Sequence, residues 1–417
     1  MFTIPSRKKD KFFLIDIIFL DRSCPGGKLY YIDYREVAPI ALGIYIHVPF
    51  CLGKCSYCDF VSYRWEPDKV CAYLEALAKE VKMRSKKMSG NIKQVESLYI
   101  GGGTPTCLNG EEILFVIEKC SFYFNVLPYA EISLEANPGT ISMEKLEFLY
   151  RGGVNRLSIG AQACQGRLLK LLGRKHSFAD VQDAVRSARK AGYRNISIDL
   201  IFGIPGQTLG DWNESLQRVI ELSPEHISAY GLHLAEDTPL YERVNNGELD
   251  VLEEETELKM YEKAIDVITA AGFEHYEISN FALPGRQCRH NLLYWRNLPY
   301  LGLGPAAYSY LNNRRFGNEK SLEKYIQMIN EGKPAEAESE ALPQRIRMAE
   351  TVILGLRLLK GIDLNEFALR FGKRLEEVYP EQIDKFVKLK LIEHEGEIIR
   401  LTRKGLAVSN QVFVEFV

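Results

Sequence analysis

The sequence predicts an α/β protein in which a partial parallel barrel of six β-α repeats precedes a small, winged-helix-like α+β domain. Two observations support this fold class. From residue 42 onward, short β-rich runs alternate with longer segments of helical period, and Gly or Pro stands at most strand ends. After residue 341 the order changes to helices, a hairpin and a final helix. Repeated β-α units form parallel sheets with right-handed crossovers, and such sheets close or partly close into barrels.

The elements of the barrel succeed one another along the chain. Its six strand candidates are runs rich in β-branched and aromatic residues, at 44–48, 95–100, 131–135, 156–159, 195–200 and 226–230. The helix candidates between them are segments of helical period, at 67–88, 110–123, 142–151, 178–191 and 209–221. A further helix over 254–271 and a strand over 275–278 complete this part, so we assign residues 42–282 to the barrel.

Three other segments complete the predicted domain organisation. Residues 1–41 form an N-terminal extension of unassigned role, and residues 283–340 form a connecting segment. Residues 341–417 form the winged-helix-like domain. Its helix candidates lie at 344–359, 364–371 and 380–391, its hairpin at 392–401 with a turn at Gly396, and its last helix begins near Thr402. This domain has 13 Lys and Arg against 11 Asp and Glu, too weak an excess to favour DNA binding, so we expect a structural or protein-contact role.

The overall composition excludes several classes of protein. With 46% hydrophobic and 26% charged residues, the chain has the composition of an ordinary globular protein. A net charge of −2 gives no reason to expect nucleic acid as a partner, and no apolar run is long enough to span a membrane. The nine cysteines are odd in number and no secretory signal stands out, which favours free thiols in a reducing cytoplasm over a disulfide framework. We therefore expect a cytoplasmic protein with at most peripheral membrane contact.

Polar residues recur at the carboxyl ends of four predicted strands. They are Gly101–Thr104, Glu135, Gln162 and Asp199. Each one alone is compatible with a simple turn or a helix cap. Because the carboxyl ends of parallel strands meet at one end of a barrel, four in phase favour a single functional site there.

Three cysteines, Cys51, Cys55 and Cys58, lie within eight residues directly after the first strand. Close thiolates repel one another unless a cation or a cluster offsets their charge. A structural zinc ion normally takes four ligands, and the loop offers three. A [4Fe–4S] cluster held by three thiolates keeps one iron open for a substrate or cofactor, and Gly53 allows the loop to fold closely around such a cluster.

This Cys-x3-Cys-x2-Cys loop resembles the signature of radical S-adenosylmethionine (SAM) proteins. Five further motifs resemble the oxygen-independent coproporphyrinogen oxidase family, over roughly residues 42–415. They are Tyr45–Cys51, Gly101–Pro105, Glu135–Pro138, Leu157–Gln162 and Asp199–Pro205. The resemblance implies a radical-SAM barrel, a [4Fe–4S] cluster on the three cysteines, SAM at the open iron and an electron donor for the cluster. It also implies a set of SAM-binding residues: Tyr45, Gly102, Gly103, Thr104, Glu135, Gln162, Arg174 and Asp199.

Two features favour the branch of HemW-type heme chaperones within this family. The true oxidase carries a fourth cysteine two residues past the third, where this chain has Phe60. The segment His290–Trp295, in the connecting segment, resembles the HNxxYW motif of those chaperones, which implies heme contacts by His290, Tyr294 and Trp295. A histidine can supply an axial nitrogen to heme iron, and aromatic rings can stack on a porphyrin. From the residues alone, a packed aromatic segment whose histidine only forms hydrogen bonds is the alternative.

The sequence thus leaves three hypotheses of different classes. The first is a heme chaperone that binds heme and delivers it to apo-proteins. The second is an enzyme, coproporphyrinogen III dehydrogenase, which shares the SAM residues. The third is a winged-helix regulator that uses the cluster as a redox sensor, and the charge of the C-terminal domain does not favour it. No acid or base catalytic residue is assigned, because hydrogen abstraction from an apolar carbon needs none.

Overall fold

The computed structural model describes residues 19–20, 29–30, 42–88 and 94–417, and the chain divides into two contact units, Met1–Ile40 and Ala41–Val417. In the first unit, β1 (Phe19–Leu20) pairs with β2 (Leu29–Tyr30) in antiparallel register. The rest of the expected N-terminal extension lies outside the described residues. The second unit contains all the predicted motifs.

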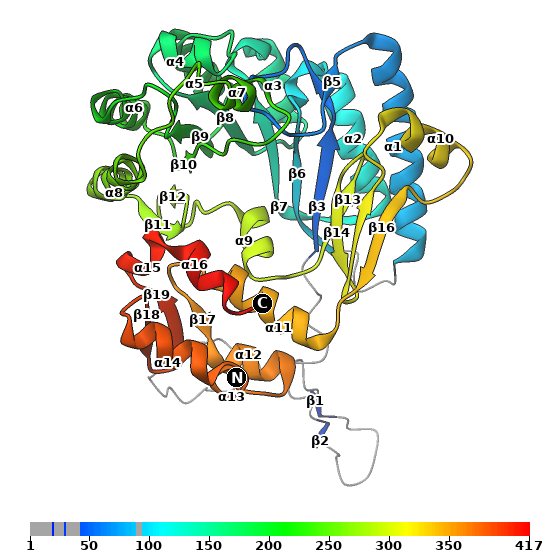
Figure 1. Cartoon of the computed structure of the whole chain (residues 1–417). Coiled ribbons are helices and arrows are strands. Elements are labelled where there is room, and N and C mark those ends of the chain that lie inside the picture. The colour runs from blue at the N-terminus through cyan, green and yellow to red at the C-terminus, as the bar shows by residue number, and fades with distance from the viewer. Residues whose placement is uncertain (1–18, 21–28, 31–41, 89–93) are drawn as a thin grey trace, which may run out of the picture. The chain divides into compact units, whose positions relative to one another are not determined.

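One twelve-stranded sheet forms the framework of the second unit (Figure 1). Its six central strands run parallel, as the sequence predicts, in the order β10-β9-β8-β7-β6-β3. Their bounds are β3 (Leu42–Val48), β6 (Gln94–Gly102), β7 (Asn125–Ala136), β8 (Arg156–Gln162), β9 (Ile196–Phe202) and β10 (His226–Gly231). The edge strands are β11 and β16, and no pairing joins them within the described chain, so the barrel is partial, as expected.

The helices that connect these strands cover the outside of the curved sheet (Figure 1). They are α1 (Pro67–Lys87), α2 (Gly110–Tyr123), α3 (Met143–Arg151), α4 (Gly166–Leu171), α5 (Phe178–Ala191), α6 (Leu209–Glu221), α7 (Pro239–Asn245) and α8 (Glu254–Ala270). Three of them begin with a reciprocal capping box, built on Asn109, Ser177 and Thr208, which satisfies the first backbone N–H groups of each helix.

The two faces of the parallel strands differ in polarity. On the outer face, side chains such as Ile44, Leu157 and Ile198 are completely buried in the main hydrophobic core. Successive side chains of a strand point to opposite faces, so the alternate positions face the inside of the barrel. These inward positions are polar, as in Ser158 and Asp199, which line an internal cavity. We call the space enclosed by the inner face the lumen.

The chain that follows β10 extends both edges of the sheet. On one side, β12 (Asn280–Ala282) pairs with β10, and β11 (Glu274–Glu277) pairs with β12. On the other side, β13 (Tyr300–Leu303) runs parallel to β3 and is followed by three antiparallel strands, β14 (Tyr308–Leu311), β15 (Arg314–Asn318) and β16 (Glu336–Ala341). Two helices lie between β12 and β16, α9 (Arg289–Trp295) and α10 (Leu322–Asn330). Residues 283–340 are therefore part of the sheet rather than a simple connection.

The C-terminal residues have the expected order of helices, hairpin and helix. The elements are α11 (Gln344–Gly355), β17 (Ile362–Asp363), α12 (Leu364–Phe371), α13 (Leu375–Val378), α14 (Pro380–Lys388), β18 (Ile392–Glu395), β19 (Ile398–Leu401), α15 (Arg403–Ala407) and α16 (Ser409–Val414). The hairpin turns at Gly396, whose φ of 59° is left-handed, and β17 adds a third strand to it. Across residues 42–88 and 94–417, no helix has the length and apolar character needed to cross a membrane.

Candidate functional site

The cysteine loop lies at the carboxyl end of β3. Its two ends are held together by the parallel pairing of β4 (Phe50–Cys51) with β5 (Tyr63–Arg64). In its middle, Ser56 donates from its backbone N–H to the carbonyl of Leu172 (3.1 Å) and from its hydroxyl to that of Leu171 (2.7 Å). The loop is thus fixed to the end of α4, which brings its three cysteines to the mouth of the barrel.

All three predicted cluster cysteines are partly buried and line one cavity. Burial raises the pKa of the Cys55 thiol, although the nearby Arg174 guanidinium opposes this, and burial also raises the pKa of Cys58. Thiolates at such positions need a strong local cation, and ferric or ferrous iron supplies one. In the described part of the chain, no three His, Cys, Asp or Glu side chains surround a point suited to a single metal ion. In a cluster, by contrast, each thiolate binds a different iron.

The cavity runs from the cysteine loop into the lumen and has a volume of about 410 Å³. Volumes of this order accommodate one cofactor of the size of SAM. Seven of the eight expected SAM residues line it, namely Gly102, Gly103, Thr104, Glu135, Gln162, Arg174 and Asp199. The eighth, Tyr45, is not among the lining residues. Its hydroxyl is hydrogen-bonded to Nδ1 of His47 (3.0 Å), and its ring centroid lies 6.2 Å from that of Tyr99, which does line the cavity.

Glycines are required where β6 meets the cysteine loop. The backbone N–H of Gly103 donates to the carbonyl of Val48 (2.9 Å), and that of Thr104 to the carbonyl of Phe50 (2.7 Å). A Cβ on Gly103 would lie 2.6 Å from the Phe50 carbonyl oxygen, so any other residue would push the loop away. The same contact brings the Thr104 hydroxyl to 3.5 Å from the Cys51 sulfur. The glycine-rich end of β6 therefore seats the first cluster cysteine.

Two partly buried carboxyl groups face the cavity without a salt bridge to a cationic side chain of the described residues. Glu135 accepts hydrogen bonds from the Tyr99 hydroxyl (2.9 Å) and the Gly102 backbone N–H (3.1 Å), and burial raises its pKa to about 7. Asp199 accepts from the Ser158 hydroxyl (3.0 Å), and burial raises its pKa as well. A ligand that carries an ammonium and a sulfonium group would restore the charge balance at these carboxylates, so the two side chains fit SAM.

Gln162 and Arg174 meet at the carboxyl end of β8, the strand between those that carry Glu135 and Asp199. Gln162 adopts a left-handed backbone conformation with φ of 65° at the end of β8. A Cβ on Gly160 would lie 2.7 Å from the Gln162 amide nitrogen and 3.3 Å from Nη2 of Arg174, so both side chains lie over this glycine. Arg174 also donates from Nη2 to the hydroxyl of Tyr57 in the cysteine loop (2.9 Å). These polar groups thus form part of the wall next to the loop.

The motif helix α9 packs against the amino-terminal end of the parallel strands. Glu131 of β7 accepts the backbone N–H groups of Arg289 (3.0 Å) and His290 (3.4 Å), so its carboxylate caps the start of the helix. His290 is 1% exposed. Its Nδ1 is hydrogen-bonded to the Ser97 hydroxyl and its Nε2 to the Tyr294 hydroxyl, both at 2.9 Å. Both ring nitrogens therefore have partners in this structure.

The C-terminal domain contacts the other end of α9. Arg370 donates to the backbone carbonyls of Arg296 (3.1 Å) and Asn297 (2.6 Å), which come directly after the helix. The guanidinium of Arg357 lies 4.4 Å from the ring centroid of Trp295. The motif helix is thus held between the barrel and the C-terminal domain. An axial bond from His290 to heme iron would require that one of its two hydrogen bonds break.

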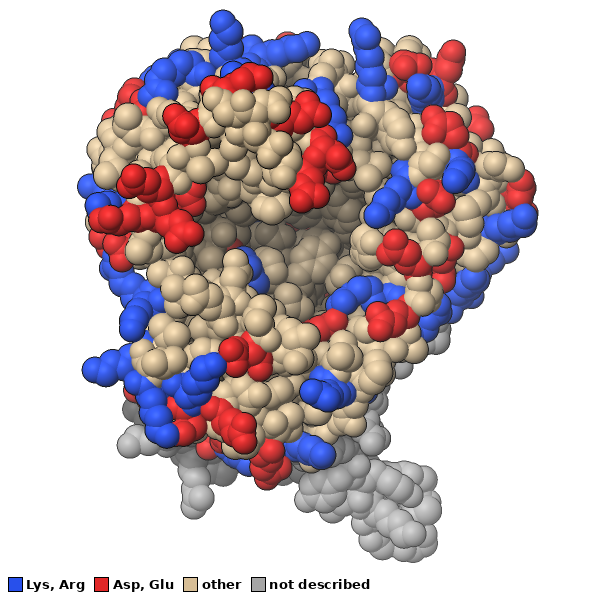
Figure 2. Space-filling model, in the orientation of Figure 1, with Lys and Arg blue, Asp and Glu red and all other residues tan. Residues whose placement is uncertain are grey.

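Several residues that line the cavity were not expected as site residues from the sequence. Among them are Arg156 at the start of β8, His226 at the start of β10 and Asn291 on α9. Every second residue of β8, counted back from Gln162, lines the cavity: Gly160, Ser158 and Arg156. The alternation of side chains along a strand could therefore have identified Arg156. Asn291 belongs to the HNxxYW segment, and it brings that motif to the same cavity as the SAM residues. Figure 2 shows a hollow in the molecule with a largely uncharged interior, on the side where the sheet is open.

The parallel barrel and the three-cysteine loop after its first strand define a radical SAM protein. The model of the Radical SAM superfamily matches residues 45–219, and that of the HemN C-terminal domain matches residues 342–408. Over most of its length the chain also resembles proteins curated as heme chaperone HemW. It is 34% identical to that of Lactococcus lactis, over 89% of this chain and 96% of the relative, and 35% identical to that of Bacillus subtilis, over 89% and 98%. The chain belongs to the HemW family.

A solved structure has the same fold over nearly the whole chain. It is that of coproporphyrinogen III oxidase (HemN) from Escherichia coli, described as a radical SAM enzyme. The two chains superpose with a TM-score of 0.79 at 25% identity, covering 92% of each. Membership of the superfamily implies a [4Fe–4S] cluster and SAM, and the thiols and carboxylates that line the cavity are compatible with both.

Proposed function

We propose that this protein is a heme chaperone that holds a [4Fe–4S] cluster through Cys51, Cys55 and Cys58, binds SAM and heme, and transfers heme to acceptor proteins. The observation that carries the proposal is the position of the HNxxYW helix. Through Asn291, this helix lines the same cavity as the residues expected to bind SAM. The relatives at 34% and 35% identity bear the name heme chaperone, which supports the same function.

The residues around the cavity would have distinct tasks in SAM binding. Glu135 and Asp199 would bind the cationic groups of SAM, and Gly102–Thr104 would hold the cysteine loop and its ligand. Gln162 and Arg174 would bound the cavity next to that loop. A cluster held by Cys51, Cys55 and Cys58 would supply one-electron reducing power next to the bound SAM, and it would need an external electron donor. Tyr45 would contribute indirectly. Its hydroxyl is hydrogen-bonded to His47, and its ring lies next to Tyr99, which lines the cavity.

Heme would be held at α9. His290 offers an imidazole nitrogen once its bond to Ser97 or Tyr294 opens, and the rings of Tyr294 and Trp295 offer apolar contact to the porphyrin. Residues 341–417 would act as a support for this helix, since Arg370 and Arg357 contact its end. In this proposal the winged-helix-like domain holds α9 and takes no part in nucleic-acid binding.

The second candidate is coproporphyrinogen III dehydrogenase, which the structural match to HemN favours. The residue against it is Phe60. This side chain is 58% exposed and lies at the rim of the cavity, where the oxidase pattern has a cysteine. A phenyl ring in place of a thiol changes the chemistry of the rim while leaving the three cluster cysteines intact.

The deciding experiment uses the full chain with its cluster reconstituted under anaerobic conditions. Heme is titrated by absorbance, and its transfer to an apo-cytochrome is followed. In parallel, coproporphyrinogen III is added with SAM and reductant. We expect stoichiometric heme uptake, lost in His290→Ala and retained in His394→Ala, which alters an exposed histidine on β18. Formation of protoporphyrinogen at a useful rate would establish the dehydrogenase instead, and uptake unaffected by His290→Ala would remove that residue as a ligand.

A further inference from the structure

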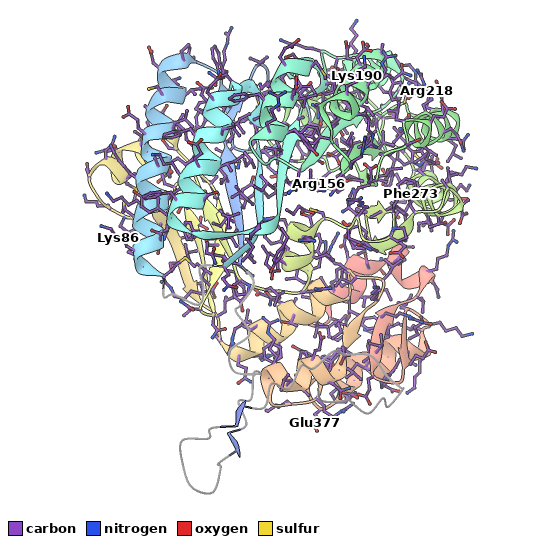
Figure 3. The ribbon with its side chains drawn as sticks, turned by 180° about the vertical axis from the view of Figure 1, so that it is seen from behind. Lys86, Arg156, Lys190, Arg218, Phe273 and Glu377 are labelled. Carbon is purple, nitrogen blue, oxygen red and sulfur yellow. The ribbon has the colours of Figure 1, made fainter. Side chains whose placement is uncertain are left out.

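Arg156 is a buried cation with two hydrogen-bonding nitrogens that have no partner among the described residues. It begins β8 and lies in the interior of the barrel, where Figure 3 labels it. The side chain is 2% exposed, and it lines the cavity. Its Nε and Nη1 atoms are buried and have no hydrogen-bond partner among the residues that the structure describes. Burial disfavours the charge of this guanidinium, but the nearby Cys288 and Glu131 raise its pKa, so it stays charged without a direct salt bridge to any described residue.

The carboxylates around Arg156 are held by other groups. Glu131 accepts the amides at the start of α9, Glu135 accepts from Tyr99 and Gly102, and Asp199 accepts from Ser158. The neighbouring imidazole of His226 is likewise engaged, with Ser197 at Nδ1 (2.8 Å) and Tyr276 at Nε2 (2.9 Å). The free N–H groups of Arg156 are therefore available to an acceptor that enters the lumen.

The electrostatics of the lumen leave room for such an acceptor. The N-terminus of α9 offsets the charge of Glu131. Burial raises the pKa of both Glu135 and Asp199, which shifts these groups toward their neutral forms, whereas the guanidinium of Arg156 stays charged. A carboxylate is the group that best matches planar guanidinium donors in a buried site.

We propose that Arg156 binds a ligand carboxylate in the lumen, and that this carboxylate is a propionate of heme. The inference rests on the proposed heme binding. Its structural basis is the cavity, which Arg156 and Asn291 of the HNxxYW helix line together. A porphyrin held at α9 would present its propionates to the lumen, where Arg156 has two free donors. Arg174 lines the same cavity and also has a free Nε, but its Nη2 is held by the Tyr57 hydroxyl of the cysteine loop. The methionyl carboxylate of SAM has the same chemistry and is the other source.

A matched pair of variants separates a binding role from a structural one. Arg84 is also buried, at 6% exposed, but it pairs with Glu336 (2.5 Å) and donates to Asn318 (3.0 Å). Arg84→Met should lower the unfolding temperature by several degrees because it leaves those groups without a partner. Arg156→Met removes an unpartnered charge, so its unfolding temperature without ligand should stay the same or rise.

The binding experiment uses the full chain with its reconstituted cluster and three ligands: heme, the iron protoporphyrin dimethyl ester, and SAM. We expect Arg156→Met to weaken heme binding at least tenfold and to leave SAM binding unchanged, with partial recovery in Arg156→Lys. The ester has no carboxylate, so it should bind the wild type and Arg156→Met equally. These results would support the propionate assignment.

Other outcomes are equally informative. If Arg156→Met weakens SAM and not heme, the carboxylate comes from SAM and the propionate assignment is overturned. If neither ligand is affected, or if Arg156→Met unfolds as readily as Arg84→Met, the binding role of Arg156 is refuted. If the wild type fails to bind heme, the proposed function falls, while the SAM titration still tests Arg156 on its own.

Discussion

The hydroxyl of Ser97 and Nδ1 of His290 lie 2.9 Å apart and join β6 to the motif helix, across 193 positions of sequence. The second ring nitrogen of His290 is occupied by Tyr294, at the same distance. His290 therefore joins α9 to the barrel strand β6 in this structure, and the same side chain is the expected heme ligand. If His290 leaves these hydrogen bonds to bind heme iron, both the stability of the protein and its binding of heme should change.

The stability of the protein should depend on pH through His290. Burial, and next the charge of Arg156, lower the pKa of His290 to about 3. A histidine with a folded pKa below its unfolded value of about 6.5 destabilises the fold as pH falls through 6.5 toward that lower value. Between pH 7 and pH 5, the wild type should therefore lose about 2 kcal/mol of unfolding free energy relative to His290→Asn. Urea unfolding of both proteins at the two pH values measures the difference. An unchanged difference would mean that the ring is open to solvent.

SAM binding should strengthen as pH rises from 6 to 8. The Glu135 carboxyl has its pKa raised to about 7, mainly by burial, and only its ionised form neutralises a cationic ligand. We expect the dissociation constant for SAM to improve several-fold over this range in the wild type. Glu135→Gln should bind SAM more weakly and with little pH dependence. Equilibrium dialysis at three pH values tests this, and a parallel pH profile in the variant would assign the titration to another group.

Removing the contact between the C-terminal domain and α9 should loosen the motif helix. Arg370→Met deletes two hydrogen bonds to the carbonyls of Arg296 and Asn297. We expect faster hydrogen exchange at the α9 amides and faster association of heme. The control is Arg403→Met, which removes a surface ion pair between the C-terminal domain and Asp266 of α8. Equal exchange rates in the two variants would contradict a specific role for Arg370.

A methyl group at Gly103 should disrupt the cluster loop. Its Cβ would lie 2.6 Å from the Phe50 carbonyl, and backbone atoms cannot move aside without displacing Cys51. Gly103→Ala should therefore lower both cluster content and SAM affinity. At Gly166, the first residue of α4, an added Cβ has nothing within 4 Å, so Gly166→Ala should stabilise the protein by about 0.5–1 kcal/mol. Iron and sulfide analysis with thermal unfolding distinguishes the two. Full cluster occupancy in Gly103→Ala would show that the loop tolerates the shift.

The three cysteines of the loop should be individually necessary for the cluster. Replacement of Cys51, Cys55 or Cys58 by Ala should abolish its visible absorbance. Cys107 is the informative control, because it lies near Cys51. Burial, and next the charge of the Cys51 thiolate, raise the pKa of Cys107 to about 11. Cys107→Ala should keep the absorbance. Loss of the cluster in that variant would indicate a fourth ligand.

The parallel strands could be predicted from sequence because their signals are local. Each is a short apolar run with a turn residue after it, and six observed strands lie where the pattern puts them. β7 begins at Asn125, earlier than expected, and includes Pro128. This proline is tolerated because it lies in the irregular stretch of the pairing with β6, between Val126 and Glu131, and the pairing with β8 starts only at Ser133. The strands β13–β16 were not expected, because they are short and pair through contacts distant in sequence.

The candidate site could be predicted only in part, for the same reason. Motif residues such as Glu135 and Gln162 stand at strand ends, where the end of each apolar run identifies them in the sequence. Arg156 stands at a strand beginning and looks like an ordinary charged residue until the register assigns it to the lumen. The environment of His290 depends on Ser97, and no local pattern links the two.

The alternation of polar and apolar side chains along the parallel strands limits how this family can diverge. Inserting one residue in β8 would exchange Arg156 and Ser158 for Leu157 and Ile159 on the inner face, so the cavity would become apolar while charged groups entered the core. Lengths can therefore vary freely only in the loops between strands and helices. A new ligand preference would then arise most directly by substitution at inward positions, or by changes in α9, because neither alters the register of the strands.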